Sequence, residues 1–203
     1  MRKLSIYFIS LTLLVLVAAG CSKAPTVEQE AATSAMAAAT AAEAETYAAE
    51  SMQKARSAQQ AFEEEMKLQE GKFALLRKYD AATALAQEAK AAAEMAAQQA
   101  VENKNQMRQE LAGMIQETRT LLTEAQGMLS TAPTGKGSTM DLQVMKSDLT
   151  AAGTTVDEAQ ALLDQDKLAD GMAKVQAART TILSVKTSVE QAIQMKAGAR
   201  KSG

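Results

Sequence analysis

The sequence contains no histidine, no tryptophan and only one cysteine among its 203 residues. A single cysteine rules out a disulfide within the chain. Without histidine or a spare thiol, the common pairs of nucleophile and base are missing, and a zinc site would depend on carboxylates alone. The chain also lacks a glycine-rich phosphate loop. We therefore expect no catalytic residue, no metal site and no cofactor, and we predict that the protein is not an enzyme.

Proline and aromatic residues are nearly as scarce. The two prolines are Pro25 and Pro133, and aromatic residues make up 3% of the chain. Between and beyond the prolines the chain is rich in Ala, Glu, Gln, Lys and Met, which are strong helix formers. This composition predicts an all-α fold.

The sequence also lacks a basic stripe. The 22 basic and 24 acidic residues are interspersed and give a net charge of −2. A nucleic-acid-binding protein usually carries a basic patch or stripe. We therefore expect no nucleic acid among the partners.

The first 20 residues have the layout of a secretory signal. Arg2 and Lys3 precede an apolar run over residues 4–19, and small residues lead up to Gly20 and Cys21. We expect residues 1–20 to be a signal peptide that is cleaved between Gly20 and Cys21. An ordinary signal peptide with an incidental cysteine, or an uncleaved anchor, are the alternatives.

The stretch "AAGC" at residues 18–21 resembles the lipobox of bacterial lipoproteins, with Ala18 in place of the usual leucine. The resemblance implies that Cys21 carries a diacylglycerol and a further acyl chain, with palmitate among the fatty acids. Two or three acyl chains anchor a protein stably to a membrane. The family's sorting rule and Ser22 imply a lipid anchor in the outer membrane, on its periplasmic face.

Helical patterns and helix breaks divide the rest of the chain. "STAPTGKGS" at residues 130–138 must interrupt any helix, and a turn is expected near Gly71 or slightly later at "LLRKYD". One helix should run from about residue 27 to residue 69, and the next should start near Lys72. The expected regions after the signal peptide are a tether at 21–26, a long antiparallel alanine-rich helical hairpin at 27–102, a three-helix bundle at 103–197 and a frayed tail at 198–203.

The second helix of the hairpin carries a heptad stripe made mostly of alanine. Its members are Leu75, Tyr79, Ala82, Ala86, Ala89, Ala93, Ala96 and Ala100. Phe62 should come near Tyr79, and Phe73 should help to close the end of the hairpin. Methyl groups bury little area, so this surface needs a cover: a second copy, the bundle or a partner. The candidate self-association seam, called the alanine seam below, is Ala86, Ala89, Ala93, Ala96 and Ala100.

The pattern changes near residues 101–106, where two steps of four residues form a stutter. Beyond it the expected stripe is Met107, Leu111, Met114, Thr118, Leu121, Ala125 and Met128. Two further stripes follow, separated by a tight turn at "DQDK". Because these stripes contain Leu, Ile and Val, we expect the second half to be more stable. The spacing that starts at Tyr79 is echoed by the spacing that starts at Leu168.

The stretches "ETYAAESMQKARSAQQAF" and "KYDAATALAQEAKAAAEMAAQQA" resemble an alanine-rich helical-hairpin domain of unknown function from Gram-negative envelope lipoproteins. The murein (Braun-type) lipoprotein is a weaker likeness. We predict a lipid-anchored helical scaffold, spacer or docking protein, with itself or another envelope protein as partner. The alternative is an accessory subunit of an envelope complex that binds a partner peptide or a lipid in a groove between helices.

Overall fold

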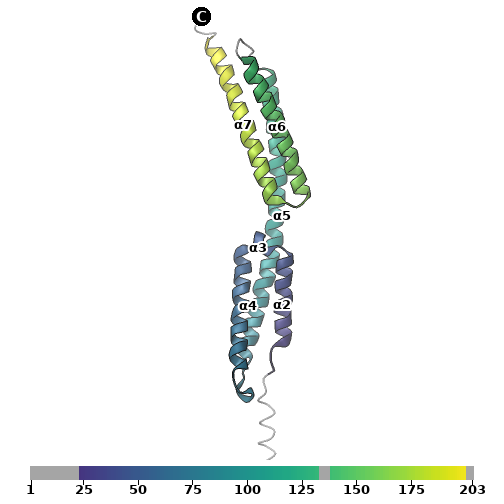
Figure 1. Ribbon diagram of the computed structural model, residues 1–203, viewed down its shortest axis with the longest axis vertical. Coiled ribbons are helices and arrows are strands. Elements are labelled where there is room, and N and C mark those ends of the chain that lie inside the picture. Colours follow the sequence, from purple (N-terminus) through teal and green to yellow (C-terminus); the bar gives the residue numbers. More distant parts are fainter. Residues whose placement is uncertain (1–22, 133–137, 200–203) are drawn as a thin grey trace, which may run out of the picture. The chain divides into compact units, whose positions relative to one another are not determined.

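The computed structural model describes residues 23–132 and 138–199. The described residues contain six α-helices, one short 3-10 helix and no strand (Figure 1), so the predicted all-α fold is confirmed. The helices are α2 (Thr26–Ala41), α3 (Ala44–Tyr47), α4 (Ala49–Glu70), α5 (Asp80–Ser130), α6 (Ser138–Asp164) and α7 (Leu168–Ala199), and the 3-10 helix is η1 (Ala74–Leu76).

The chain divides into two compact units. Unit 1 ends at Lys104 and unit 2 begins at Asn105. The division falls inside α5, which passes through residues 101–106 without a break. Each unit therefore has its own core, and each is described separately below.

Unit 1 is a bundle of α2, α4 and the first part of α5, which lie side by side (Figure 1). The prediction of one helix from 27 to 69 is wrong, because the chain turns back between Ala41 and Ala49. The expected hairpin is present as α4 and α5, and α2 covers it as a third helix. One core cluster takes a single alanine from each helix, Ala35, Ala55 and Ala93. A methyl side chain at all three positions allows the backbones to approach closely.

The predicted heptad stripe on α5 is buried from Tyr79 to Ala100, with exposed fractions of 0 to 6%. The prediction that Leu75 is the first member of this stripe is wrong. Helix α5 starts at Asp80 and not near Lys72, and Leu75 lies in η1 with more than half of its surface exposed. Asp80 suits a helix start because its carboxylate faces the positive end of the helix dipole.

Phe62 and Tyr79 close one end of the core of unit 1. Phe62 and Tyr79 share a cluster with Ala82 and Ala86, and Ala24 packs against it. The predicted contact of Phe62 with Tyr79 is thus confirmed. Phe73 is not part of this closure, because 71% of its surface is exposed.

Unit 2 is the expected three-helix bundle of α5, α6 and α7. The turn between α6 and α7 covers residues 165–167, as "DQDK" predicted. Its largest fully buried apolar side chains are Leu111, Ile115, Leu149, Val156, Leu168, Val175, Ile182 and Val189. The core is therefore built from branched side chains, whereas unit 1 is built mainly from alanine.

One stripe of unit 2 is shifted from its predicted positions. On the unit 2 part of α5 the fully buried residues are Leu111, Ile115, Thr118 and Ala125, while Met114 is only half-buried. The expected step from Leu111 to Met114 is replaced by a step of four to Ile115. The run of four-residue steps that forms the stutter therefore continues to Ile115, one step further than predicted.

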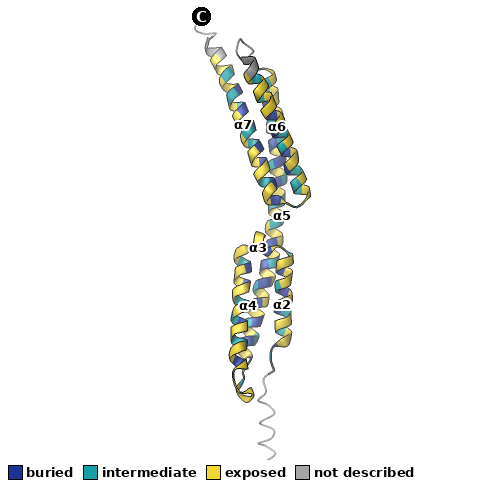
Figure 2. Cartoon of the chain, in the orientation of Figure 1, coloured by how far each residue is buried: buried dark blue, intermediate teal, exposed yellow. Residues whose placement is uncertain are grey.

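The two units repeat the same buried pattern at a constant separation of 89 residues. A stripe of seven positions begins at Tyr79, just before α5, and a matching stripe of seven begins at Leu168 in α7; all fourteen residues are buried. Figure 2 shows buried residues along both helices. The pairs are Tyr79 and Leu168, Ala82 and Gly171, Ala86 and Val175, Ala89 and Ala178, Ala93 and Ile182, Ala96 and Val185, and Ala100 and Val189. The echo at Tyr79 and Leu168 is therefore structural. The equivalent positions hold mostly alanine in unit 1 and mostly larger side chains in unit 2.

Candidate functional site

The residues predicted to carry the lipid, Gly20 and Cys21, lie outside the described residues. The first described residues are Lys23 and Ala24. Ala24 packs against the cluster of Phe62 and Tyr79 at one end of unit 1. The described chain thus begins on the core of unit 1, with Ala24 three residues after Cys21.

The alanine seam is not available to a second copy in this structure. Ala86, Ala89, Ala93, Ala96 and Ala100 each have an exposed fraction of 0%. Helices α2 and α4 of the same chain cover the seam: Ala93 packs with Ala35 and Ala55. The hypothesis of a self-association seam is therefore corrected, because the chain supplies the cover itself. The sequence does not show this cover, because no proline or glycine marks the break after Ala41.

A groove runs between α4 and α5 on the outside of unit 1, with a volume of about 850 Å³. Small side chains form its floor, including Ala58, Ala61, Ala91 and Ala92, and Met95 lies along it. At one end the hydroxyl of Ser51 donates a hydrogen bond to the side-chain oxygen of Gln99. The groove is thus shallow, mostly uncharged and lined by residues too small to fill it.

Glu50, Lys54 and Glu88 are the charged residues that line this groove, and the first two form an ion pair. The Nζ atom of Lys54 lies 2.8 Å from Oε1 of Glu50, one helical turn away. The hydrogen bond from Lys54, together with its positive charge, lowers the pKa of the exposed Glu50 carboxyl. A lowered pKa keeps this carboxylate ionised and unsuited to general acid catalysis. The alanines of the lining leave room for an apolar or small-residue helix face.

Unit 2 has a smaller hollow of about 470 Å³ between α5 and α6. Leu129, Leu142 and Leu149 give it an apolar lining, and Lys146 supplies one charge. No group of three or more metal-binding side chains occurs in the part of the chain that the structure describes. Within the same residues, every fully buried side-chain nitrogen or oxygen atom has a hydrogen-bond partner.

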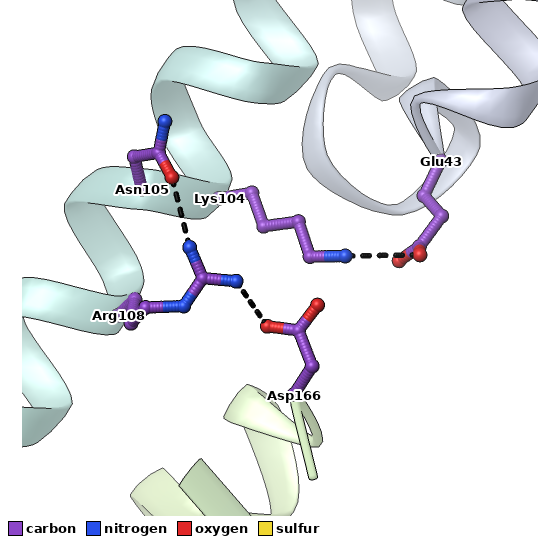
Figure 3. Close-up of polar contacts among 5 residues, drawn as sticks. All are labelled: Glu43, Lys104, Asn105, Arg108 and Asp166. Carbon is purple, nitrogen blue, oxygen red and sulfur yellow. Dashed lines mark hydrogen bonds and ion pairs between the residues drawn. The ribbon is translucent and has the colours of Figure 1, made fainter. Parts of the chain in front are cut away.

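Two cations of α5 hold the turns of their own units (Figure 3). In unit 1, Nζ of Lys104 lies 2.9 Å from Oε1 of Glu43, in the bend after α2. In unit 2, Nη2 of Arg108 lies 2.5 Å from Oδ1 of Asp166, in the turn after α6. Both acids have a left-handed backbone, with φ of 58° and 63°. These contacts are structural, because each carboxylate is engaged by a cation.

The segment at residues 68–78, called the tip loop below, joins α4 to α5 and is held by polar contacts. The guanidinium of Arg77 donates to the carbonyl oxygens of Lys72 (3.1 Å) and Glu70 (2.9 Å). The backbone N–H of Lys78 donates to Oε1 of Gln69 at 3.0 Å, and Gln69 is buried. The bond to Glu70 satisfies a carbonyl in the last turn of α4, where carbonyls lack a helical partner. The sequence pattern does not predict this arrangement, because Phe73 and Leu75 continue an apolar helical spacing.

None of the described helices is long and apolar enough to cross a membrane. Comparison with known proteins gives no relative: no family model matches the chain, and neither does any curated protein or solved structure.

Proposed function

We propose that the protein is a non-enzymatic, lipid-anchored helical scaffold of the bacterial cell envelope. Cys21 carries the acyl chains, and the two helical bundles extend from the outer membrane on its periplasmic side as a spacer or docking protein. Homotypic contacts or another envelope protein provide the partner.

The observation that carries this proposal is the short path from the lipobox-like "AAGC" to the core of unit 1. Ala24 already packs against the Phe62 and Tyr79 cluster, so only Ser22 and Lys23 separate Cys21 from folded structure. Three residues span at most about 11 Å. An acyl chain on Cys21 would therefore hold unit 1 close to the membrane. The described residues add helices and small hollows but no catalytic constellation, which suits a scaffold.

Metabolic labelling of the full chain with an alkyne fatty acid tests the anchor. In a Gram-negative host the natural chain should incorporate the label and sediment with the outer membrane. The matched variant Cys21→Ser should lose both the label and the membrane fraction. An unlabelled natural chain, or a labelled Cys21→Ser variant, would contradict the proposal.

A second function is favoured by the groove between α4 and α5. Its alanine lining and its volume of about 850 Å³ suit one helix of a partner protein, since small residues allow helices to approach closely. In this function the protein is an accessory subunit that docks a partner peptide or a lipid. Both functions use the lipid anchor at Cys21. They differ in whether a partner occupies the groove.

Crosslinking from the groove separates the two functions. Met95 lies in the groove and is exposed, so a photoreactive residue there should capture a groove partner in intact envelopes. The same residue at Gln87, which is exposed on α5 and does not line the groove, is the control. Met95→Glu should abolish capture of such a partner. Equal products from both positions would leave the plain scaffold as the function.

A further inference from the structure

The tip loop exposes a group of large apolar side chains. The exposed fractions are 71% for Phe73, 67% for Leu76, 62% for Leu68 and 55% for Leu75. These four residues lie within nine positions of the chain, at one end of unit 1. Patches of this kind mark sites of contact with a protein or a membrane.

The loop holds these side chains outward by its own hydrogen bonds. Buried Gln69 and the guanidinium of Arg77 occupy the inner side, where they bind backbone groups of the loop. The 3-10 turn places Leu75 and Leu76 together, and the N–H of Leu76 donates to the carbonyl of Phe73 at 2.8 Å. The amide side chain of Gln69 is thus buried while Phe73, Leu75 and Leu76 are exposed, which reverses the usual placement of polar and apolar side chains. An outward apolar face on an ordered loop is suited to an apolar environment outside the chain.

Cations flank the apolar patch. Lys67, Lys72, Arg77 and Lys78 lie within or beside the tip loop, and the acids in the same stretch are Glu65, Glu70 and Asp80. Lys67, Lys72 and Lys78 are all exposed. The chain as a whole is acidic, with a net charge of −2, so this end differs from the average surface. Lysines around an apolar patch fit the anionic headgroups and the acyl boundary of a bilayer.

The tip loop lies at the end of unit 1 where the described chain begins (Figure 1). Tyr79, which follows the loop directly, shares a core cluster with Ala24. Cys21 is three residues before Ala24, a reach of about 11 Å at most. Any membrane that holds Cys21 is therefore close to the apolar patch. The same end also exposes Val27, in the first turn of α2.

We propose that the tip loop is a membrane-contact site: Phe73, Leu75 and Leu76 enter the bilayer surface beside the anchored Cys21, while the surrounding lysines meet anionic headgroups. This inference rests on the proposed lipid anchor. It adds a second attachment point, which fixes the orientation of unit 1 on the membrane. A flexible lipid tether alone leaves that orientation free.

Tryptophan fluorescence tests the contact, because the chain contains no tryptophan of its own. Phe73→Trp places a single probe at an exposed position, so the core is not disturbed. Val101→Trp is the matched control: Val101 is 51% exposed and lies on α5 about 30 Å from Asp80, at 1.5 Å per residue. The chain from Cys21 to Gly203 is coupled through its only cysteine to a maleimide lipid in vesicles of phosphatidylethanolamine and phosphatidylglycerol. This coupling holds Cys21 at the bilayer whether or not a cell acylates it.

The tryptophan at position 73 should shift its emission to shorter wavelength on coupling, and brominated lipids should quench it. The tryptophan at position 101 should show neither effect. Adding Leu75→Ser and Leu76→Ser to the Phe73→Trp chain should weaken quenching, because each buried leucine contributes on the order of tenfold to partition. Vesicles of phosphatidylcholine alone should quench less.

Equal emission and quenching at positions 73 and 101 would overturn the membrane-contact site. So would an emission shift that grows with protein concentration in the absence of vesicles, because it would assign the patch to a second copy of the chain. Neither result would affect the lipid anchor, which the labelling of Cys21 in cells tests separately.

Discussion

The Nζ atom of Lys104 lies 2.9 Å from Oε1 of Glu43, a residue whose backbone adopts the left-handed conformation with φ of 58°. Lys104 also lies over the ring of Tyr47, with Nζ 5.4 Å from the centroid. Its neighbour Asn103 donates from Nδ2 to the carbonyl oxygen of Tyr47 at 2.7 Å. Two consecutive side chains of α5 thus hold both ends of the bend that separates α2 from α4. The bend forms without proline or glycine because α5 stabilises it.

The left-handed backbone at Glu43 predicts that glycine is better than alanine at this position. Both Glu43→Gly and Glu43→Ala remove the carboxylate, so the lost ion pair cancels between them. An alanine with φ of 58° carries a strain of about 1–2 kcal/mol that glycine avoids. We expect Glu43→Gly to be more stable by about 1 kcal/mol, as measured by urea unfolding.

The control pair for this comparison is Glu102→Gly and Glu102→Ala, at an exposed helical position of α5. There alanine should be the more stable by about 1 kcal/mol. The same order at positions 43 and 102 would show that Glu43 is not held in the left-handed conformation in solution.

The ion pair of Glu50 and Lys54 predicts a pH effect of defined sign. Lys54 lowers the pKa of the Glu50 carboxyl in the folded chain, and Lys54→Met should raise it toward its ordinary value. Because the folded-state pKa is depressed, the stabilising contribution of the pair is present above the unfolded-state pKa. It is lost as the pH falls through the folded-state pKa.

Carboxyl titration by NMR measures this change directly. Lys67→Met, at the other end of α4, is the control and should leave the pKa of Glu50 low. A Glu50 pKa that is the same in the natural chain and in Lys54→Met would show that the pair does not form in solution.

Two glycines inside helices should respond oppositely to the same substitution. A methyl group added at Gly113 would meet no atom within 4 Å, whereas at Gly171 it would lie 2.6 Å from Cδ2 of Leu111. Gly113→Ala should stabilise the chain by about 0.5–1 kcal/mol through helix propensity. Gly171→Ala should destabilise it by about 1–3 kcal/mol, because buried Leu111 has little room to move.

Thermal unfolding of the two variants, with Gly127→Ala as a second open position, checks this contrast. A stabilised Gly171→Ala variant would mean that Leu111 repacks easily and that the core of unit 2 is looser than its burial indicates.

The all-α fold and most buried stripes could be predicted from the sequence, because helix propensity and apolar spacing are local properties. The stripe from Tyr79 to Ala100 is predicted correctly for this reason, and so is the turn before Leu168. The break at Glu43 could not be predicted in this way. It depends on Lys104, 61 residues later, and the alanines on both sides favour helix equally.

Uniform alanine also hides the number of neighbouring helices. A stripe of methyl groups has the same pattern whether one helix or two cover it, so the sequence favours a hairpin where a bundle is found. Similarly, Phe73 and Leu75 continue a helical spacing, and only the polar contacts of Gln69 and Arg77 turn them outward. The lipid site at Cys21, by contrast, is predicted from a local motif. It lies outside the described residues and stays a prediction.

Ala93 and Ile182 occupy equivalent buried positions of the two units, and exchanging their sizes should damage each unit for a different reason. Ala93 packs with Ala35 and Ala55 in a layer of three methyl groups, so Ala93→Ile overfills it and should cost about 1–3 kcal/mol. Ile182 is fully buried, so Ile182→Ala leaves a cavity and should cost about 2–5 kcal/mol.

Hydrogen exchange resolved along the chain can assign each loss to its unit. In the natural protein the amides of unit 2 should be the better protected, because branched side chains bury more apolar area than alanine. Ala93→Ile should lower protection in unit 1, and Ile182→Ala should lower it in unit 2. Ala84→Ile, at an exposed position of α5, should change neither. If Ala93→Ile were as harmless as Ala84→Ile, the methyl layer would not be closely packed, and α2 would not be the cover of the alanine seam.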